Sequence, residues 1–247
     1  MTSNRYFLRT LCGAAAGLSL VVKPAGAQEP SSAEGEPPVL VELFLSQACS
    51  MCPPAAALFP EIAARDDVVA LSWHIDYWNM TSSANGRWED PYSKSEFTAR
   101  QKRYNKNIRH KSSIYTPQIV VGGEMETVGG KKEKISALIE TAPRTGAPIE
   151  ASLSRGGMQF EIGESDAGGN AYIVTFKKST STRITGGANA GKIFAEANVV
   201  TGIRPLGLVR KRGGELWVEK PSEGESCALI VQEPGQKRIS AAVYCPL

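Results

Sequence analysis

The first half of the sequence alternates continuous apolar runs with segments of helical composition. Strands are predicted over 39–45, 68–75, 114–121 and 124–128, and helices over 55–64, 97–108 and 131–141. Strands that alternate with helices favour parallel pairing, whereas the turn at Gly122-Gly123 closes an antiparallel hairpin. The pattern predicts an α/β domain over about 37–143, with a polar and aromatic insert over 79–109.

Beyond Pro143 the pattern changes to short alternating runs that are separated by glycine-rich turns. Strands are predicted over 149–154, 158–162, 172–177, 193–200, 216–219, 228–232 and 239–244. Runs of this kind are typical of an antiparallel sheet or sandwich. We therefore expect a β-rich C-terminal lobe over 144–247 that packs on the first domain.

The first 27 residues have the pattern of an export signal. A basic start leads into an apolar run over 11–22, and Ala25-Gly26-Ala27 supplies the small residues that favour cleavage after Ala27. The apolar run of about 12 residues is shorter than the roughly 20 that a membrane-spanning helix needs. We expect a cleaved signal peptide over 1–27, a polar linker over 28–36, and a mature protein that is periplasmic or secreted, with no stable membrane insertion.

The export signal also accounts for the positive charge of the chain. Of 28 basic residues, Arg5, Arg9 and Lys23 lie in the signal, which leaves 25 basic residues against 25 acidic ones. A mature chain with no excess charge gives no reason to expect a nucleic-acid partner.

Four cysteines remain after the signal, and an even number in an exported chain is typical of disulfides. Three pairings are open, and close spacing favours Cys49 with Cys52 and Cys227 with Cys245. Because Cys49 lies where a helix begins, the helix-start N–H groups should stabilise its thiolate. We expect Cys49 to attack and Cys52 to resolve the mixed disulfide. Cys227 and Cys245 flank a predicted hairpin, so we expect a structural disulfide there.

A second indication of redox chemistry is Thr116-Pro117, at the entry to the strand before the hairpin. A cis proline at this position would place the Thr116 backbone beside the two cysteines, where it could bind an incoming peptide. The other residues expected to contact a substrate are Ser50, Met51, Trp78 and Tyr115.

These motifs resemble those of the thioredoxin superfamily. The strand over 39–44, followed by Cys49-Ser50-Met51-Cys52, is similar to its first core strand and redox motif, and Thr116-Pro117 is similar to its cis proline. The resemblance implies a thioredoxin-like fold with a helical insert. It also implies that Glu42 is a buried acid that exchanges protons with Cys52, although the match requires one extra residue before Cys49.

The chain resembles more closely a family of secreted bacterial proteins of unknown function that have this fold. The resemblance covers about 39–245. It rests on Glu42-Leu43-Phe44, Ser46-Gln47, the segment 49–54, His74-Ile75-Asp76-Tyr77-Trp78, Phe97-Thr98-Ala99-Arg100-Gln101, Tyr115-Thr116-Pro117-Gln118 and Asn198-Val199-Val200. It implies the fold and leaves the activity open.

The function expected from these residues is thiol–disulfide exchange on exported proteins or small thiols, with a redox partner and without a cofactor. The dipeptide Ser50-Met51 does not indicate the direction of electron flow, and the insert over 79–109 is expected to cover the dithiol. Two alternatives remain open at this point. One is a non-catalytic binding protein on the same scaffold, and the other is a zinc- or copper-handling protein that uses Cys49, Cys52 and His74 as ligands.

Overall fold

The computed structural model describes residues 36–144 and 146–246, which belong to one compact unit. The expected signal peptide, and all of the expected linker except Glu36, lie outside the described residues. No helix in the described ranges is long and apolar enough to cross a membrane. The helices and strands, in chain order, are β1 (Val39–Leu45), α1 (Pro53–Ala63), β2 (Val68–His74), β3 (Ser82–Ser83), β4 (Gly86–Arg87), α2 (Ser95–Tyr104), β5 (Gln118–Val121), β6 (Met125–Val128), α3 (Lys132–Thr141), β7 (Ile149–Ser154), β8 (Gly157–Ile162), β9 (Gly169–Arg183), β10 (Ile193–Val209), β11 (Gly214–Glu219), β12 (Ser226–Gln232) and β13 (Ile239–Tyr244).

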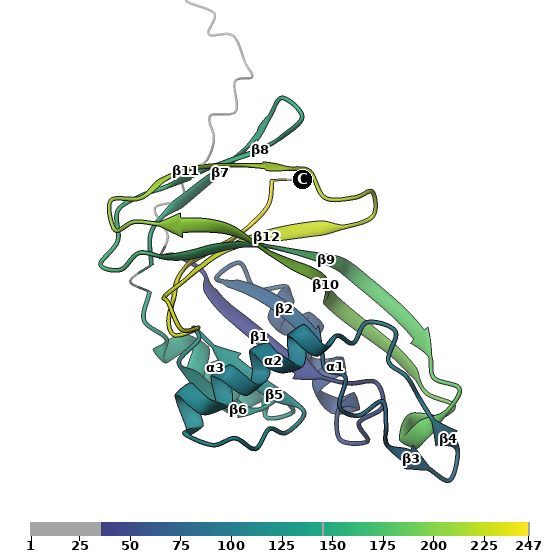
Figure 1. Cartoon of the computed structure of the whole chain (residues 1–247). Helices are drawn as coiled ribbons and strands as arrows, with labels where there is room; N and C mark the ends of the chain where they lie inside the picture. Colours follow the sequence, from purple (N-terminus) through teal and green to yellow (C-terminus); the bar gives the residue numbers. More distant parts are fainter. Residues whose placement is uncertain (1–35, 145, 247) are drawn as a thin grey trace, which may run out of the picture. The chain divides into compact units, whose positions relative to one another are not determined.

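The fold is mixed α/β and is organised around an eight-stranded sheet with the order β13-β12-β9-β10-β2-β1-β5-β6 (Figure 1). β1 and β2 are parallel, and β1 pairs with β5 in the antiparallel sense. A second sheet, in the order β11-β8-β7, packs against the part of the large sheet that is formed by β9, β12 and β13.

Strands from both halves of the chain share the large sheet. β10 lies beside β2 in parallel, with Val199 opposite Ser72. All residues of β2 are buried, so an unpaired second edge of this strand would leave backbone N–H and C=O groups buried without partners. The change of pattern near Pro143 therefore marks a change in how successive strands are connected. The large sheet nevertheless contains strands from both sides of Pro143.

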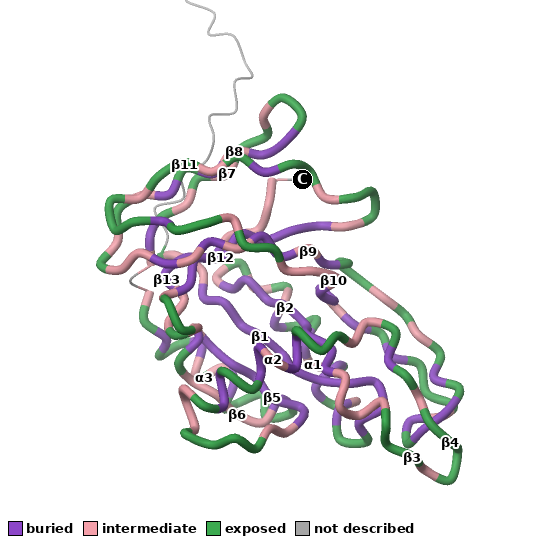
Figure 2. Tube along the Cα trace, in the orientation of Figure 1, coloured by how far each residue is buried: buried purple, intermediate pink, exposed green. Residues whose placement is uncertain are grey.

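The two faces of the large sheet are covered by different helices, as the alternation of β1 requires. Residues of β1 at odd positions, such as Leu43, pack with α1, α3 and both cysteines of the dithiol. Leu40 and Phe44 point to the other face, where they pack with Phe97 and Tyr104 of α2. The central strands are buried on both faces (Figure 2).

Several elements differ in length from the sequence prediction. β9 and β10 extend well beyond the predicted 172–177 and 193–200, because they pair along their length from Ile193 opposite Arg183 to Val209 opposite Gly169. The strand predicted over 114–121 begins only at Gln118. The helix predicted over 97–108 is divided into α2 and a π-helical turn over Asn105–Arg109.

Candidate functional site

The dithiol lies in the loop between β1 and α1. Cys52 is the N-cap of α1, and the two prolines that follow it occupy the first helical positions, where a missing N–H costs no hydrogen bond. The Cys52 N–H donates to the Cys49 carbonyl at 3.2 Å. Close spacing favoured pairing Cys49 with Cys52, but in the structure both cysteines are free thiols. Cys49 is only 1% exposed and Cys52 is 0% exposed.

The two thiols differ in acidity. The pKa of Cys49 is lowered to about 7, chiefly because the Cys52 thiol hydrogen-bonds to it, and the backbone N–H groups of Met51 and Cys52 add to this effect against the opposing influence of burial. Burial raises the pKa of Cys52 well above its ordinary value, and the neighbouring Cys49 raises it further. Cys49 therefore ionises first, and its thiolate is the stronger nucleophile of the pair at neutral pH.

Thr116 and Pro117 lie beside the dithiol, and the peptide bond between them is cis, as the resemblance implied. The Cys49 Sγ is 3.9 Å from the Thr116 carbonyl oxygen. The indole N–H of Trp78 donates to the Thr116 hydroxyl at 2.7 Å, so this predicted contact residue borders the site. The neighbouring Tyr77 has a buried hydroxyl without a hydrogen-bond partner, and burial is the main cause that raises its pKa to about 12.

The other predicted contact residues have different surroundings. Ser50 is exposed, and Met51 is 68% exposed, so both face solvent beside the dithiol. The Tyr115 hydroxyl donates to Glu126 on β6, and the Tyr115 carbonyl accepts from Gln101. The structure thus ties Tyr115 to β6 and α2.

Glu42 lies on the sheet face opposite to the cysteines, which differs from the expectation. Its carboxylate accepts from Arg100 Nε at 2.6 Å and Nη2 at 3.1 Å, and also from the Tyr104 hydroxyl. Successive residues of a strand point to opposite faces, so the one extra residue before Cys49 moves Glu42 away from Cys52 and places Leu43 on the cysteine side. The proton-exchanging role expected of Glu42 does not fit this position.

His74 is held by carboxylates and is fully buried. Its Nδ1–H donates to Asp90 Oδ2 at 2.7 Å, and its Nε2 is 3.4 Å from Glu196 Oε1. Burial alone would lower the pKa of His74, but the two negative charges outweigh burial and raise it to about 9. Within 36–144 and 146–246, no group of three or more His, Cys, Asp or Glu side chains is arranged to hold a metal ion, so the arrangement does not support Cys49, Cys52 and His74 as a ligand set.

Gln47, two residues before Cys49, is the centre of a buried network that the sequence analysis did not identify. Its backbone N–H donates to Asp90 Oδ2 at 2.7 Å, and its side-chain NH₂ donates to Glu196 Oε2 at 2.8 Å. The Trp88 indole N–H donates to the Gln47 side-chain oxygen at 3.2 Å. The Asn189 amide donates to the carbonyls of both Gln47 and Cys49, at 2.9 and 2.8 Å. The only sequence signal was a polar Ser46-Gln47 pair directly after a buried strand.

The dithiol loop is therefore covered from two sides. The insert contributes Trp88 and Asp90, which bind Gln47, and the turn between β9 and β10 contributes Asn189. The expectation that the insert over 79–109 covers the dithiol holds only for this part of it, because α2 packs on the opposite face of the sheet. Ile184 and Phe194, at the two ends of that turn, pack in the same apolar cluster as the cysteines.

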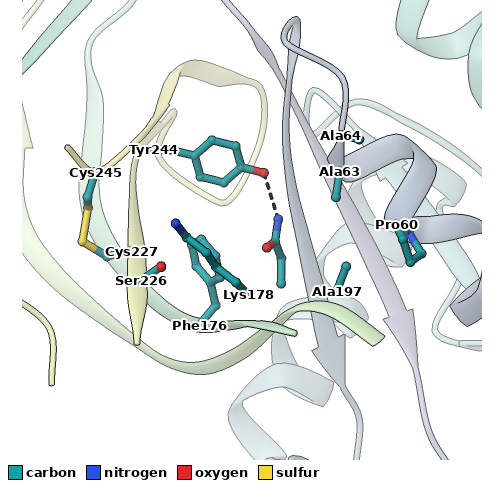
Figure 3. A pocket seen from close by; sticks show the side chains of 11 residues that line it. Pro60, Ala63, Ala64, Phe176, Lys178, Ala197, Ser226, Cys227, Tyr244 and Cys245 are labelled. Carbon is teal, nitrogen blue, oxygen red and sulfur yellow. Dashed lines mark hydrogen bonds between the residues drawn. A yellow bond between two sulfur atoms is a disulfide. The ribbon is translucent and has the colours of Figure 1, made fainter. Parts of the chain in front are cut away.

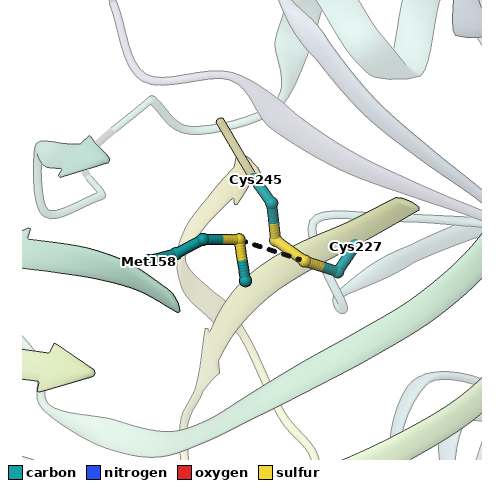
Figure 4. Close-up of a disulfide and its surroundings, with 3 residues drawn as sticks. All are labelled: Met158, Cys227 and Cys245. Atoms are coloured by element: carbon teal, nitrogen blue, oxygen red, sulfur yellow. Dashed lines mark hydrogen bonds between the residues drawn. A yellow bond between two sulfur atoms is a disulfide. The ribbon is translucent and has the colours of Figure 1, made fainter. Parts of the chain in front are cut away.

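Cys227 and Cys245 form the expected disulfide, with their Cα atoms 5.3 Å apart. The Met158 sulfur lies 3.8 Å from Cys227 Sγ (Figure 4). The disulfide also borders a cavity of about 420 Å³ between the C-terminal end of α1 and the strands β9, β10, β12 and β13 (Figure 3). Asn198, in this cavity, donates to the Tyr244 hydroxyl at 3.0 Å and to the Ala70 carbonyl at 2.9 Å. The dithiol does not line this cavity.

Solved structures resemble this fold. A structural-genomics target from Agrobacterium tumefaciens is 21% identical in sequence, with a TM-score of 0.69 over 84% of this chain and 93% of its own. HBP35 of Porphyromonas gingivalis is 14% identical, with a TM-score of 0.57 over 86% of this chain and 76% of its own. At these identities the likeness concerns the fold alone. Among curated proteins, none matches the sequence. A family of proteins of unknown function, DUF1223, matches residues 40–232, and the chain belongs to this family.

Proposed function

We propose that this protein is an exported thiol–disulfide oxidoreductase on a thioredoxin-like scaffold, and that Cys49 and Cys52 are its redox pair. The observation that carries the proposal is the place of the two free thiols at the start of α1, with Cys49 Sγ 3.9 Å from the carbonyl oxygen of Thr116, the residue before the cis proline. The lowered pKa of Cys49 and the raised pKa of Cys52 agree with it. A thiolate that exists at neutral pH next to a protonated resolving thiol is what disulfide exchange requires.

In the proposed reaction, the Cys49 thiolate attacks one sulfur of a substrate disulfide. The substrate S–S bond breaks, a mixed disulfide forms, and the other substrate sulfur leaves as a thiolate that takes up a proton. Cys52 then loses its proton and attacks the Cys49 sulfur, which releases the second substrate thiol and forms the Cys49–Cys52 disulfide. Two electrons pass from the dithiol to the substrate, and the same steps in reverse oxidise a substrate dithiol.

The surroundings of the dithiol support a peptide substrate. The Thr116 carbonyl oxygen accepts from the Cys49 thiol at 3.9 Å, so the backbone of this segment lies directly beside the attacking atom. Met51 is 68% exposed and offers an apolar contact next to the dithiol. The proposed substrates are exported proteins or small thiols in the periplasm or outside the cell, with a separate redox partner that restores the dithiol.

The proposal is tested by equilibrating the protein across glutathione ratios and by measuring the Cys49–Cys52 couple with differential alkylation and mass spectrometry. We expect a reversible two-electron couple, and a Cys52→Ser variant that retains mixed disulfides through Cys49. Cys49→Ser is the matched control and should retain none. The absence of a reversible couple between about −120 and −300 mV, the range that spans known exchangers and structural bonds, would refute the proposal.

One observation favours a second function, that of a non-catalytic binding protein with a structural 49–52 pair. Cys49 is only 1% exposed, so a substrate disulfide would need the loop to open before it could reach the sulfur. Under this function a Cys49→Ser, Cys52→Ser double variant keeps the full partner-binding profile. A profile lost in the double variant, together with a reversible couple in the wild type, would exclude it.

A further inference from the structure

Five buried polar side chains, which come from four separate parts of the chain, meet behind the dithiol loop. We call them the Gln47 network, and its members are Gln47, His74, Asp90, Glu196 and Asn189. All of them are less than 5% exposed. They come from the loop after β1, from β2, from the insert, and from the β9–β10 hairpin with its turn.

The composition of the Gln47 network is unfavourable for stability alone. His74, Asp90 and Glu196 bring charged groups out of water, and a cluster of this kind is often no more stable than an apolar core of the same volume. His74 Nε2 and Glu196 Oε1 are also buried without a hydrogen bond, and they face each other only as an ion pair at 3.4 Å. The cost of the network suggests a role other than packing.

The hydrogen bonds of the Gln47 network are concentrated on the backbone of the dithiol loop. Asp90 accepts from the Gln47 N–H, and Asn189 donates to the carbonyls of Gln47 and Cys49. The Cys49 carbonyl also accepts from the Cys52 N–H, so Asn189 holds the peptide group that closes the turn of the dithiol. The backbone N–H groups of Met51 and Cys52, in this turn, add to the stabilisation of the Cys49 thiolate by the Cys52 thiol.

We propose that Asn189 and Gln47, which are held in place by Asp90, His74 and Glu196, are positioning residues for the Cys49 thiol. This inference rests on the proposed function, and it gives the second half of the chain a part in that function. Asn189 and Glu196 belong to the β9–β10 hairpin, which reaches the dithiol loop from more than a hundred residues away in sequence. In this view the C-terminal strands complete the redox site in addition to extending the sheet.

The test is the pH dependence of the alkylation rate of Cys49 in Asn189→Ala, measured by mass spectrometry on the full-length reduced protein. The wild type should show a midpoint near the Cys49 pKa of about 7. Asn189→Ala should move this midpoint upward, so that alkylation at pH 7, relative to the plateau that the same variant reaches at high pH, becomes about threefold slower. The reduction potential should become more negative, since a less stable thiolate makes the reduced form less favourable.

Asn198→Ala is the matched control. Like Asn189, Asn198 is buried and its amide makes two hydrogen bonds, in this case to Ala70 and Tyr244. Asn198 belongs to β10 and lies near the C-terminal end of α1, whereas Cys52 lies at the N-terminal end. Its φ of 48° adds strain for alanine, so this variant should lose at least as much stability as Asn189→Ala. It should nevertheless leave the Cys49 midpoint unchanged.

The outcomes separate the inference from the proposed function. If the wild type shows no reversible couple, the proposed function fails. If the wild type has the couple and folded Asn189→Ala titrates like the wild type, the positioning role alone is refuted. If Asn189→Ala does not fold, Trp88→Phe is the second variant, because it keeps an aromatic ring, although a smaller one, and removes the hydrogen bond to Gln47, one of the two proposed positioning residues. An unchanged Cys49 midpoint in Trp88→Phe then overturns the inference.

Discussion

Raising the pH from 7 to 9 should destabilise this protein through His74. Asp90 and Glu196 raise the His74 pKa to about 9 in the folded state despite complete burial, whereas the ordinary value is 6.5. A group with a raised folded pKa contributes stability that is complete below its unfolded pKa. That contribution is lost as the pH rises through the folded value. His74 therefore stabilises the fold at pH 6 and gives little stability above pH 9.

The size of this loss follows from the number of protons bound: between the two pKa values of His74, the folded state binds one proton more than the unfolded state. Between pH 6.5 and 9 the free energy of unfolding should fall by about 1.4 kcal/mol for each pH unit. From pH 7 to 9 the loss is about 2 to 3 kcal/mol, which is a large share of the 5–15 kcal/mol that keeps a typical domain folded.

The assay is urea unfolding at pH 7, 8 and 9 in a Cys49→Ser, Cys52→Ser background. This background is needed because Cys49, with its pKa lowered to about 7, also titrates in this range and interacts with Cys52, whose pKa is raised well above its ordinary value. Glu196→Gln is the matched variant, since its amide oxygen can still accept from Gln47 while one negative charge beside His74 is removed. We expect a smaller loss between pH 7 and 9 in this variant. A stability that stays flat or rises from pH 7 to 9 in the cysteine-free parent would refute the reasoning.

Three further outcomes are expected from other parts of the structure. Glu42→Gln leaves the buried guanidinium of Arg100 without its counter-charge and should lower the free energy of unfolding in urea by about 3–5 kcal/mol. A decrease below about 1 kcal/mol would contradict a stabilising contact between the two side chains. Replacing Cys227 and Cys245 together with Ala opens a link across 18 residues and should lower the unfolding free energy by about 3 kcal/mol; an unchanged Tm would argue against a stabilising disulfide. Trp78→Phe removes the 2.7 Å hydrogen bond to the threonine hydroxyl before the cis proline, and should reduce kcat/KM on a disulfide substrate about fivefold, because one such bond contributes about 1 kcal/mol. An equal kcat/KM in this variant would show that the contact does not serve the substrate.

β1, α1 and β2 could be predicted from the sequence, because local patterns determine them, whereas the start of β5 and the end of α2 could not. The apolar runs at β1 and β2 and the cysteine–proline segment at the start of α1 each carry their signal within a few residues. The same holds for the Cys227–Cys245 pair, which close spacing favoured. These features depend on the identity and spacing of neighbours in the chain.

The sequence did not indicate which face of β1 carries Glu42, since a shift of one residue reverses every side chain of a strand. It also did not reveal that β10 pairs with β2, because a contact between residues such as Val199 and Ser72 has no local signature. Long-range pairing is decided by which edge of the folded sheet still has free backbone groups.

The dithiol shows the same division. Its residue types, its place before a helix, and Thr116-Pro117 beside it were all evident in the sequence. The burial of the two thiols, the position of Thr116 beside Cys49, and the support of the loop by Asn189, which is 140 residues away in the chain, were decided by tertiary contacts. The physical reason is that burial, charge and hydrogen bonding act over a few ångströms in space, and the chain brings these distant groups within that range only by folding.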